Sequence, residues 1–182
     1  MRELGVICAR LGSARVPTKA LAVVGACTLF EHAERAAAES RRLERVLCAS
    51  NLPPWGMPTR IADGPLIGAL QWALDQVVAE YDVVVTLQAC IPFRTGAHID
   101  ATIEMLDRCG LDSAQTVVNV GWDAAPVWKP NGAVYATRTA WVRQGRIIGP
   151  RHGCLAMTPA ESVNVDSAWD LRVARGVCTS SS

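Results

Sequence analysis

The stretch that decides the fold is LGVICA at residues 4–9, followed by RLGSARVPTK at residues 10–19. The first part is a short, continuous apolar run, which predicts a central parallel strand that is buried on both faces. The second part changes to glycine, serine, proline and three cations, with no acid among them. Exposed backbone N–H groups in such a loop, together with Arg10, Arg15 and Lys19, suit a polyphosphate.

The loop matches neither of two common nucleotide-binding signatures. GxxxxGK[ST] and GxGxxG are both absent from the chain, so the residues indicate neither a Walker A loop nor a dinucleotide fingerprint. From the loop alone, a solvated basic connection between a strand and a helix remains the alternative to a phosphate site.

The composition predicts one ordinary globular domain. The chain has 182 residues, half of them hydrophobic, and a formal net charge of +1, so we expect no nucleic-acid polymer as partner. No apolar stretch reaches membrane-spanning length, and residue 1 leads straight into the first strand, so we expect neither a membrane partner nor a signal peptide. Seven scattered cysteines without a CxxC pair predict free thiols and a cytoplasmic location.

Hydrophobic periodicity predicts an alternation of strands and helices after the loop. A helix over 28–42 and a strand over 45–50 complete a right-handed βαβ unit, with a ligand crevice at the carboxyl end of the first strand. The other expected elements are helices over 65–81, 97–109, 138–144 and 169–174, strands over 82–88, 112–120, 129–135 and 161–166, and a loop over 145–159. We expect Ser167 to cap the closing helix, with Asp170 as an acid of its first turn.

Four blocks, in the family's order, resemble the sugar-activating cytidylyltransferases, namely the acylneuraminate cytidylyltransferase (CMP-sialic acid synthetase) and CMP-KDO synthetase enzymes. The blocks are ARxGSxRxPxKxL at 9–21, LQxxxPFRT at 87–95, NGAVY at 131–135 and NVDSAWD at 164–170. The resemblance implies an α/β fold: a three-layer αβα sandwich, Rossmann-like and of the nucleotide-diphospho-sugar transferase (GT-A-like) type, with a mostly parallel central sheet. A single nucleotidyltransferase domain would cover residues 1–176, and 177–182 would form a flexible tail.

The resemblance also implies roles for individual residues. The residues implied to bind the nucleotide are Ala9, Arg10, Gly12, Ser13, Arg15 and Lys19. Those implied to bind the sugar are Gln88, Arg94, Asn131 and Tyr135, while Lys19, Arg10 and Asp166 are the implied catalytic residues. For Arg94, a salt bridge beside the following helix is the alternative. Arg60 and Asp63 stand roughly where the family approaches the base of CTP.

The implied cofactor is Mg²⁺, held against the CTP phosphates by Asp166 and Asn164. Alternation along a strand over 161–166 would put these two side chains on one face. The family has two acids here, so the amide of Asn164 should weaken the metal site.

Three departures fall where the family contacts nucleotide, metal or dimer partner. Ala20 replaces the usual Asn, Asn164 replaces an acid, and the connection before residue 129 is too short for the family's dimerisation arm. Cys90 stands at the position of the metal-binding Asp of the CMP-KDO enzymes, which favours the sialic-acid branch.

The sequence thus predicts a cytoplasmic nucleotidyltransferase that transfers CMP from CTP to the hydroxyl of an acylneuraminate or related acidic sugar and releases pyrophosphate. Two alternatives stay open. One is the same fold with another nucleotide or acceptor, and the other is a degenerate homologue that binds nucleotide or protein without catalysis. The oligomeric state is open as well.

Overall fold

A computed structural model describes residues 1–10, 12–51 and 64–180 of the chain. Arg60 and Asp63, which the sequence places near the base of the nucleotide, lie outside the described residues.

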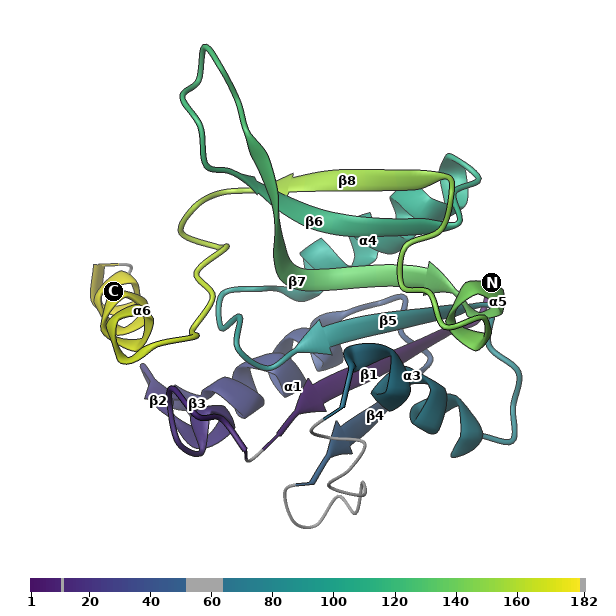
Figure 1. The fold of residues 1–182 in the computed structure, drawn as a ribbon, viewed down its shortest axis with the longest axis horizontal. Coiled ribbons are helices and arrows are strands. Elements are labelled where there is room, and N and C mark those ends of the chain that lie inside the picture. The colour runs from purple at the N-terminus through teal and green to yellow at the C-terminus, as the bar shows by residue number, and fades with distance from the viewer. Residues whose placement is uncertain (11, 52–63, 181–182) are drawn as a thin grey trace.

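The described residues form a six-stranded sheet with strand order β4-β1-β5-β7-β6-β8 (Figure 1). The bounds of its strands are β1 Glu3–Ala9, β4 Arg45–Ser50, β5 Val83–Gln88, β6 Ser113–Asn119, β7 Trp128–Arg138 and β8 His152–Met157. β1 pairs in parallel with β4 on one side and β5 on the other, as the apolar run at its core predicts. β7 runs antiparallel to both of its neighbours, and β6 pairs in parallel with β8. The predicted α/β fold with a mostly parallel central sheet is confirmed.

Helices cover both faces of this sheet and make three layers. α1 (Leu29–Glu39) and α4 (Gly96–Arg108) pack on one face, against a core that includes Ile7 of β1. α3 (Leu66–Asp75) and α5 (Thr139–Arg143) pack on the other, in a core that contains Val6. Successive residues of β1 therefore enter opposite cores, which is why the strand is apolar without alternation.

A third, smaller core lies beside the sheet. The hairpin of β2 (Val23–Val24) and β3 (Cys27–Thr28) packs there with α6 (Ala168–Ser180). α6 includes most of the segment that we expected to be a flexible tail, and Cys178 packs against this core. The tail prediction is therefore wrong up to residue 180, because the last turns of the helix have an apolar surface to cover.

Two further expectations fail near the end of the chain. The expected loop over 145–159 contains β8, where pairing with β6 overrides the weak strand propensity of HGCLAM. The expected strand over 161–166 is absent, because β8 already occupies the sheet edge next to β6. Val165 is buried there, and its N–H donates to the carbonyl of Cys90 at 2.9 Å.

Two helices are shorter than predicted. α3 ends at Asp75 rather than near residue 81, and Val78 beyond it is fully exposed, so the helical spacing was misleading there. α1 ends at Glu39, since the carboxylate of Asp100 on α4 accepts hydrogen bonds from the backbone N–H groups of Arg41 and Arg42.

The connection between β6 and β7 covers residues 120–127 and forms a tight hairpin, closed by a bond of 2.8 Å from the N–H of Val120 to the carbonyl of Val127. It stands away from the sheet in Figure 1, and the Trp122 side chain on it is 83% exposed. Among the helices of the described residues, none combines the length and the apolar character needed to cross a membrane.

Candidate functional site

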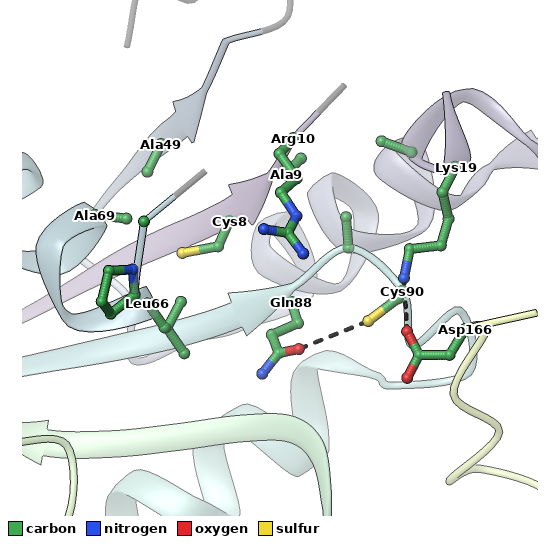
Figure 2. A pocket seen from close by; sticks show the side chains of 14 residues that line it. Cys8, Ala9, Arg10, Lys19, Ala49, Leu66, Ala69, Gln88, Cys90 and Asp166 are labelled. Atoms are coloured by element: carbon green, nitrogen blue, oxygen red, sulfur yellow. Dashed lines mark hydrogen bonds and ion pairs between the residues drawn. The ribbon is translucent and has the colours of Figure 1, made fainter. Parts of the chain in front are cut away.

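A pocket of about 300 Å³ lies at the carboxyl ends of β1 and β5, where the sequence predicts a ligand crevice. Figure 2 shows Lys19, Asp166 and Cys90 at one end of it, and the small or aliphatic residues Ala49, Ala69 and Leu66 at the other. Arg10 and Gln88 lie between the two ends. Such a pocket suits a ligand with an anionic part and a flat, less polar part.

The loop after β1 brings Lys19 into this pocket by a short turn. The N–H of Lys19 donates to the carbonyl of Val16 at 3.1 Å, and η1 (Lys19–Leu21) begins there. Thr18, directly before it, has a φ of 50°, a left-handed conformation that is unusual for a β-branched residue. The strained residue fixes the direction in which the backbone, and with it the Lys19 side chain, enters the pocket.

The predicted nucleotide-binding residues divide into two groups. Ala9, Arg10 and Lys19 line the pocket. The other three, Gly12, Ser13 and Arg15, lie on the turn outside its lining. The Ser13 hydroxyl accepts a long hydrogen bond of 3.4 Å from the N–H of Val16, so it also supports the turn.

Lys19 and Asp166 meet at one end of the pocket although they are 147 residues apart in the chain. Lys19 Nζ lies 2.8 Å from Asp166 Oδ1, and an Arg15 nitrogen lies 3.8 Å from the same oxygen. Two of the three loop cations thus contact one carboxylate. Arg10 forms no ion pair within the described part of the chain, and its guanidinium points into the pocket (Figure 2).

The segment before α6 holds Asp166 in place from both sides. On one side, Val165 is bonded to the end of β5 through Cys90. On the other, the Asp170 carboxylate accepts hydrogen bonds from the N–H groups of Asp166 and Ser167, at 3.0 and 2.7 Å. The Ser167 hydroxyl in turn accepts from the N–H of Asp170 at 3.2 Å. The predicted cap of the closing helix and the structural role of Asp170 are confirmed.

The donor atoms present determine which metal ion the pocket could take. Asn164 Oδ1 is buried and has no hydrogen-bond partner within the described residues, so it is open to a further ligand. Asn164 does not line the pocket, however, and the strand that was to align it with Asp166 is absent. The carboxylate of Asp166 alone fits Mg²⁺ only where phosphate and water oxygens complete the octahedron, so Asn164 as a second metal ligand stays a prediction.

Gln88 and Cys90 form the wall of the pocket at the end of β5. The Cys90 thiol donates to Gln88 Oε1 across 3.7 Å, and burial raises its pKa, so the thiol stays protonated at neutral pH. A Cβ at Gly132 would lie 3.5 Å from Gln88 Nε2, and Gly132 has a φ of 81°. The NGAVY stretch of β7 at 131–135 therefore packs against the Gln88 side chain.

The sequence predicts either a sugar contact or a salt bridge beside the following helix for Arg94, and the structure has it elsewhere. It is 3% exposed and does not line the pocket, and it forms no salt bridge with a described residue. Its Nη1 instead donates to the carbonyls of Gln88 and Ala133, at 3.0 and 2.8 Å, which ties the end of β5 to β7. Burial lowers the pKa of Arg94 to about 10, so the guanidinium stays charged at neutral pH.

Asn131 and Tyr135, the other two predicted sugar contacts, do not line the pocket either. Asn131 is 5% exposed, and its amide is engaged inside the protein by Thr116, Ser162 and the N–H of Ala133. We therefore assign Asn131 a structural role. Tyr135 is half-buried on β7, and burial raises its pKa; a sugar contact by Tyr135 stays a prediction.

Sequence reasoning missed the apolar end of the pocket. Cys8, Ala49, Leu66 and Ala69 line it, from β1, β4 and α3. Their positions in the sequence could have indicated them, because the carboxyl ends of adjacent parallel strands and the start of the next helix meet at one edge of a sheet.

The geometry is that of an α/β protein with a ligand pocket at the carboxyl ends of its central parallel strands, and comparison with solved structures identifies the fold. No known family profile matches the chain, and no curated protein is a significant match in sequence. Among solved structures, CMP:2-keto-3-deoxy-manno-octonic acid synthetase complexed with CTP is similar over 100% of both chains, with a TM-score of 0.80 and 16% identity.

Two further solved enzymes share the fold. One is the 4-diphosphocytidyl-2C-methyl-D-erythritol synthase of Anaerococcus prevotii, with a TM-score of 0.69 and 10% identity over 98% of both chains. The other is the 2-C-methyl-D-erythritol 4-phosphate cytidylyltransferase of Thermus thermophilus, with a TM-score of 0.60 and 18% identity over 96% of this chain and 98% of that one. At these identities the likeness establishes the fold, the one seen in cytidylyltransferases.

Proposed function

We propose that this protein is a nucleotidyltransferase that transfers CMP from CTP to a sugar hydroxyl and releases pyrophosphate. The observation that carries the proposal is the pocket at the ends of β1 and β5, with Arg10 and Lys19 facing its interior on a fold shared with a CTP-complexed synthetase. The charged end suits a triphosphate, and the end formed by Ala49, Ala69 and Leu66 suits the flat face of a base.

The reaction is an in-line attack of the acceptor hydroxyl on the α-phosphorus of CTP, with pyrophosphate as the leaving group. Such chemistry rests on positioning and on stabilising the charge of the transition state. Lys19 and Arg10 would neutralise phosphate oxygens, and Arg15 lies close enough to Asp166 to join them when a ligand is bound.

The cofactor in this proposal is Mg²⁺, which Asp166 would hold beside the phosphates, without Asn164, whose amide oxygen is buried outside the pocket. When bound, it would offset the negative charge of the triphosphate. Asp166 is the one carboxylate among the described residues that line the pocket, and it is paired with Lys19. Among the described lining residues there is thus no unpaired carboxylate to act as general base, and an acceptor whose hydroxyl ionises easily needs none.

For the acceptor we propose an acylneuraminate or a related acidic 2-keto sugar, whose anomeric hydroxyl needs little base catalysis. In this proposal Gln88, which lines the pocket, would contact the acceptor, and Cys90 rather than an acid lies beside Gln88. A methylerythritol phosphate acceptor is the second candidate, because one structure of similar fold is named for that acceptor and another for a diphosphocytidyl-methylerythritol product. We further propose that the protein works in the cytoplasm, in keeping with its seven free thiols.

The test is pyrophosphate release from CTP with a panel of acidic 2-keto sugars and 2-C-methyl-D-erythritol 4-phosphate, each with and without Mg²⁺. We expect release with an acidic sugar and CTP, and at least a hundredfold less with Lys19→Ala. If pyrophosphate is released only with the methylerythritol phosphate, that compound and not an acidic sugar is the acceptor. Tight nucleotide binding without release for any acceptor would favour the non-catalytic homologue.

A further inference from the structure

The pocket has few groups with which to hold a metal ion by itself. Of the described residues that line it, Asp166 alone carries a carboxylate. Throughout the described part of the chain, no group of three or more His, Cys, Asp and Glu side chains is arranged to hold a metal. The Cys90 side chain beside Asp166 offers a soft sulfur, which is a poor ligand for a hard cation.

The one carboxylate is already neutralised by cations. Lys19 Nζ lies 2.8 Å from Asp166 Oδ1, and Arg15 approaches the same oxygen to 3.8 Å. The Lys19 side chain is 20% exposed, so its ammonium has left much of its water and depends on this partner. A divalent ion that approaches Asp166 in the ligand-free protein therefore meets positive charge and a ligand oxygen that is already occupied.

A triphosphate reverses this situation. Its oxygens are better partners for an ammonium and a guanidinium than one half-exposed carboxylate, so they would draw Lys19 and Arg15 away from Asp166. The freed carboxylate and the phosphate oxygens then form a set of hard oxygen ligands that suits Mg²⁺. Each ligand thus prepares the site for the other, and the coupling must be reciprocal.

We propose that Lys19 and Arg15 block Asp166 as a metal ligand until a nucleoside triphosphate engages them, so that this pocket binds the metal–nucleotide complex and not the free metal ion. The inference rests on the proposed function, since it takes the anionic ligand to be a triphosphate. It assigns Lys19 a second role, control of the access of metal to Asp166, in addition to phosphate contact.

The three loop cations offer a matched series of variants. Lys19 contacts Asp166 closely, Arg15 contacts it at longer range with a side chain that is 73% exposed, and Arg10 lines the pocket without an ion pair to a described residue. Lys19→Met, Arg15→Met and Arg10→Met each remove one positive charge. If only the total charge of the pocket matters, the three variants should gain similar affinity for a metal ion. If release of Asp166 matters, the gain should be largest for Lys19→Met, smaller for Arg15→Met and absent for Arg10→Met.

The experiment is calorimetric titration of the ligand-free protein and its variants with Mn²⁺ alone. We expect Lys19→Met to bind Mn²⁺ about fivefold more tightly than the wild type, Arg15→Met less than twofold more tightly, and Arg10→Met equally. The gain of Lys19→Met should disappear when Asp166→Asn is added. Thermal unfolding of each variant in the absence of metal checks that the fold is kept.

A second titration, with CTP in the presence and absence of Mn²⁺, separates the inference from the proposed function. Support for the inference is weak binding of Mn²⁺ alone in the first titration, together with CTP binding that is at least tenfold tighter when Mn²⁺ is present. Wild-type protein that binds Mn²⁺ equally well without CTP, or a Lys19→Met variant without any gain, would overturn it. If CTP binds under no condition, the proposed function fails, while the Mn²⁺ series still decides whether Lys19 blocks Asp166.

Discussion

Replacement of Asp170 by alanine tests how the protein holds Asp166 in the pocket. The Asp170 carboxylate accepts from the N–H of Asp166 at 3.0 Å, and from the N–H and the hydroxyl of Ser167 at 2.7 and 2.8 Å. Asp170 is the reciprocal partner of the capping residue Ser167, so its loss should cost about 1 kcal/mol, as for the loss of a cap, and an acid in the first turn adds a few tenths through the helix dipole. We therefore expect Asp170→Ala to lower the free energy of unfolding by about 1–2 kcal/mol.

For a domain of this size, that change corresponds to a fall of about 3–6 °C in the melting temperature, measured by calorimetry or circular dichroism. Asp170→Asn keeps one oxygen acceptor and loses the charge, so its fall should be about half as large. Asp123→Ala provides the control: Asp123 is an exposed acid in the hairpin between β6 and β7, and we expect a change within about 0.5 kcal/mol.

The difference in stability between Asp170→Ala and the wild type should depend on pH. Burial acts to raise the pKa of Asp170, but the hydrogen bonds from Ser167 and the backbone outweigh it and hold the pKa below its usual value. Its contribution to stability is therefore complete above the unfolded pKa of about 4 and is lost as the pH falls through the lower folded pKa. A wild-type melting temperature for Asp170→Ala at pH 7, or a difference from the wild type that persists unchanged down to pH 2, would refute this reasoning.

Two further predictions concern Lys19 and the thiols. Lys19→Ala should reduce turnover by a hundredfold or more, because a phosphate contact is lost. It should change the free energy of unfolding by less than about 1 kcal/mol, because its partner Asp166 is 43% exposed. A loss of activity that is matched by an equal loss of stability would contradict a phosphate role. Iodoacetamide at pH 8, followed by peptide mass spectrometry, should modify the exposed Cys109 and Cys154 at least tenfold faster than Cys90, which is 9% exposed and whose pKa is raised by burial. Equal rates at the three thiols would show that Cys90 is open and ionised.

The centre of the fold could be predicted from the sequence because its signals are strong and local. The apolar run of β1 and the breaks on either side of α1 specify a parallel βαβ unit, and the structure has it. Elements at the edge were predicted less well. β8 is a strand because β6 offers it hydrogen bonds, and HGCLAM alone carries little strand propensity.

The site could be predicted in part. The cations of the loop were evident from the sequence, and the resemblance pointed to Asp166, but the pairing of Lys19 with Asp166 spans 147 residues and no local pattern encodes it. Arg94 and Asn131 are polar residues in a motif, and polarity alone does not distinguish a ligand contact from a side chain that satisfies buried backbone or hydroxyl groups. That distinction needs the burial of each residue, which only the structure supplies.

The central claim is that the pocket at the ends of β1 and β5 uses CTP. Its most direct test is calorimetric titration of the purified protein with CTP, UTP, ATP and GTP, each with and without Mg²⁺. We predict selective binding of CTP that tightens when Mg²⁺ is present, with little heat from the purine nucleotides. Preference for ATP or GTP, or no binding of any of the four, would contradict the account.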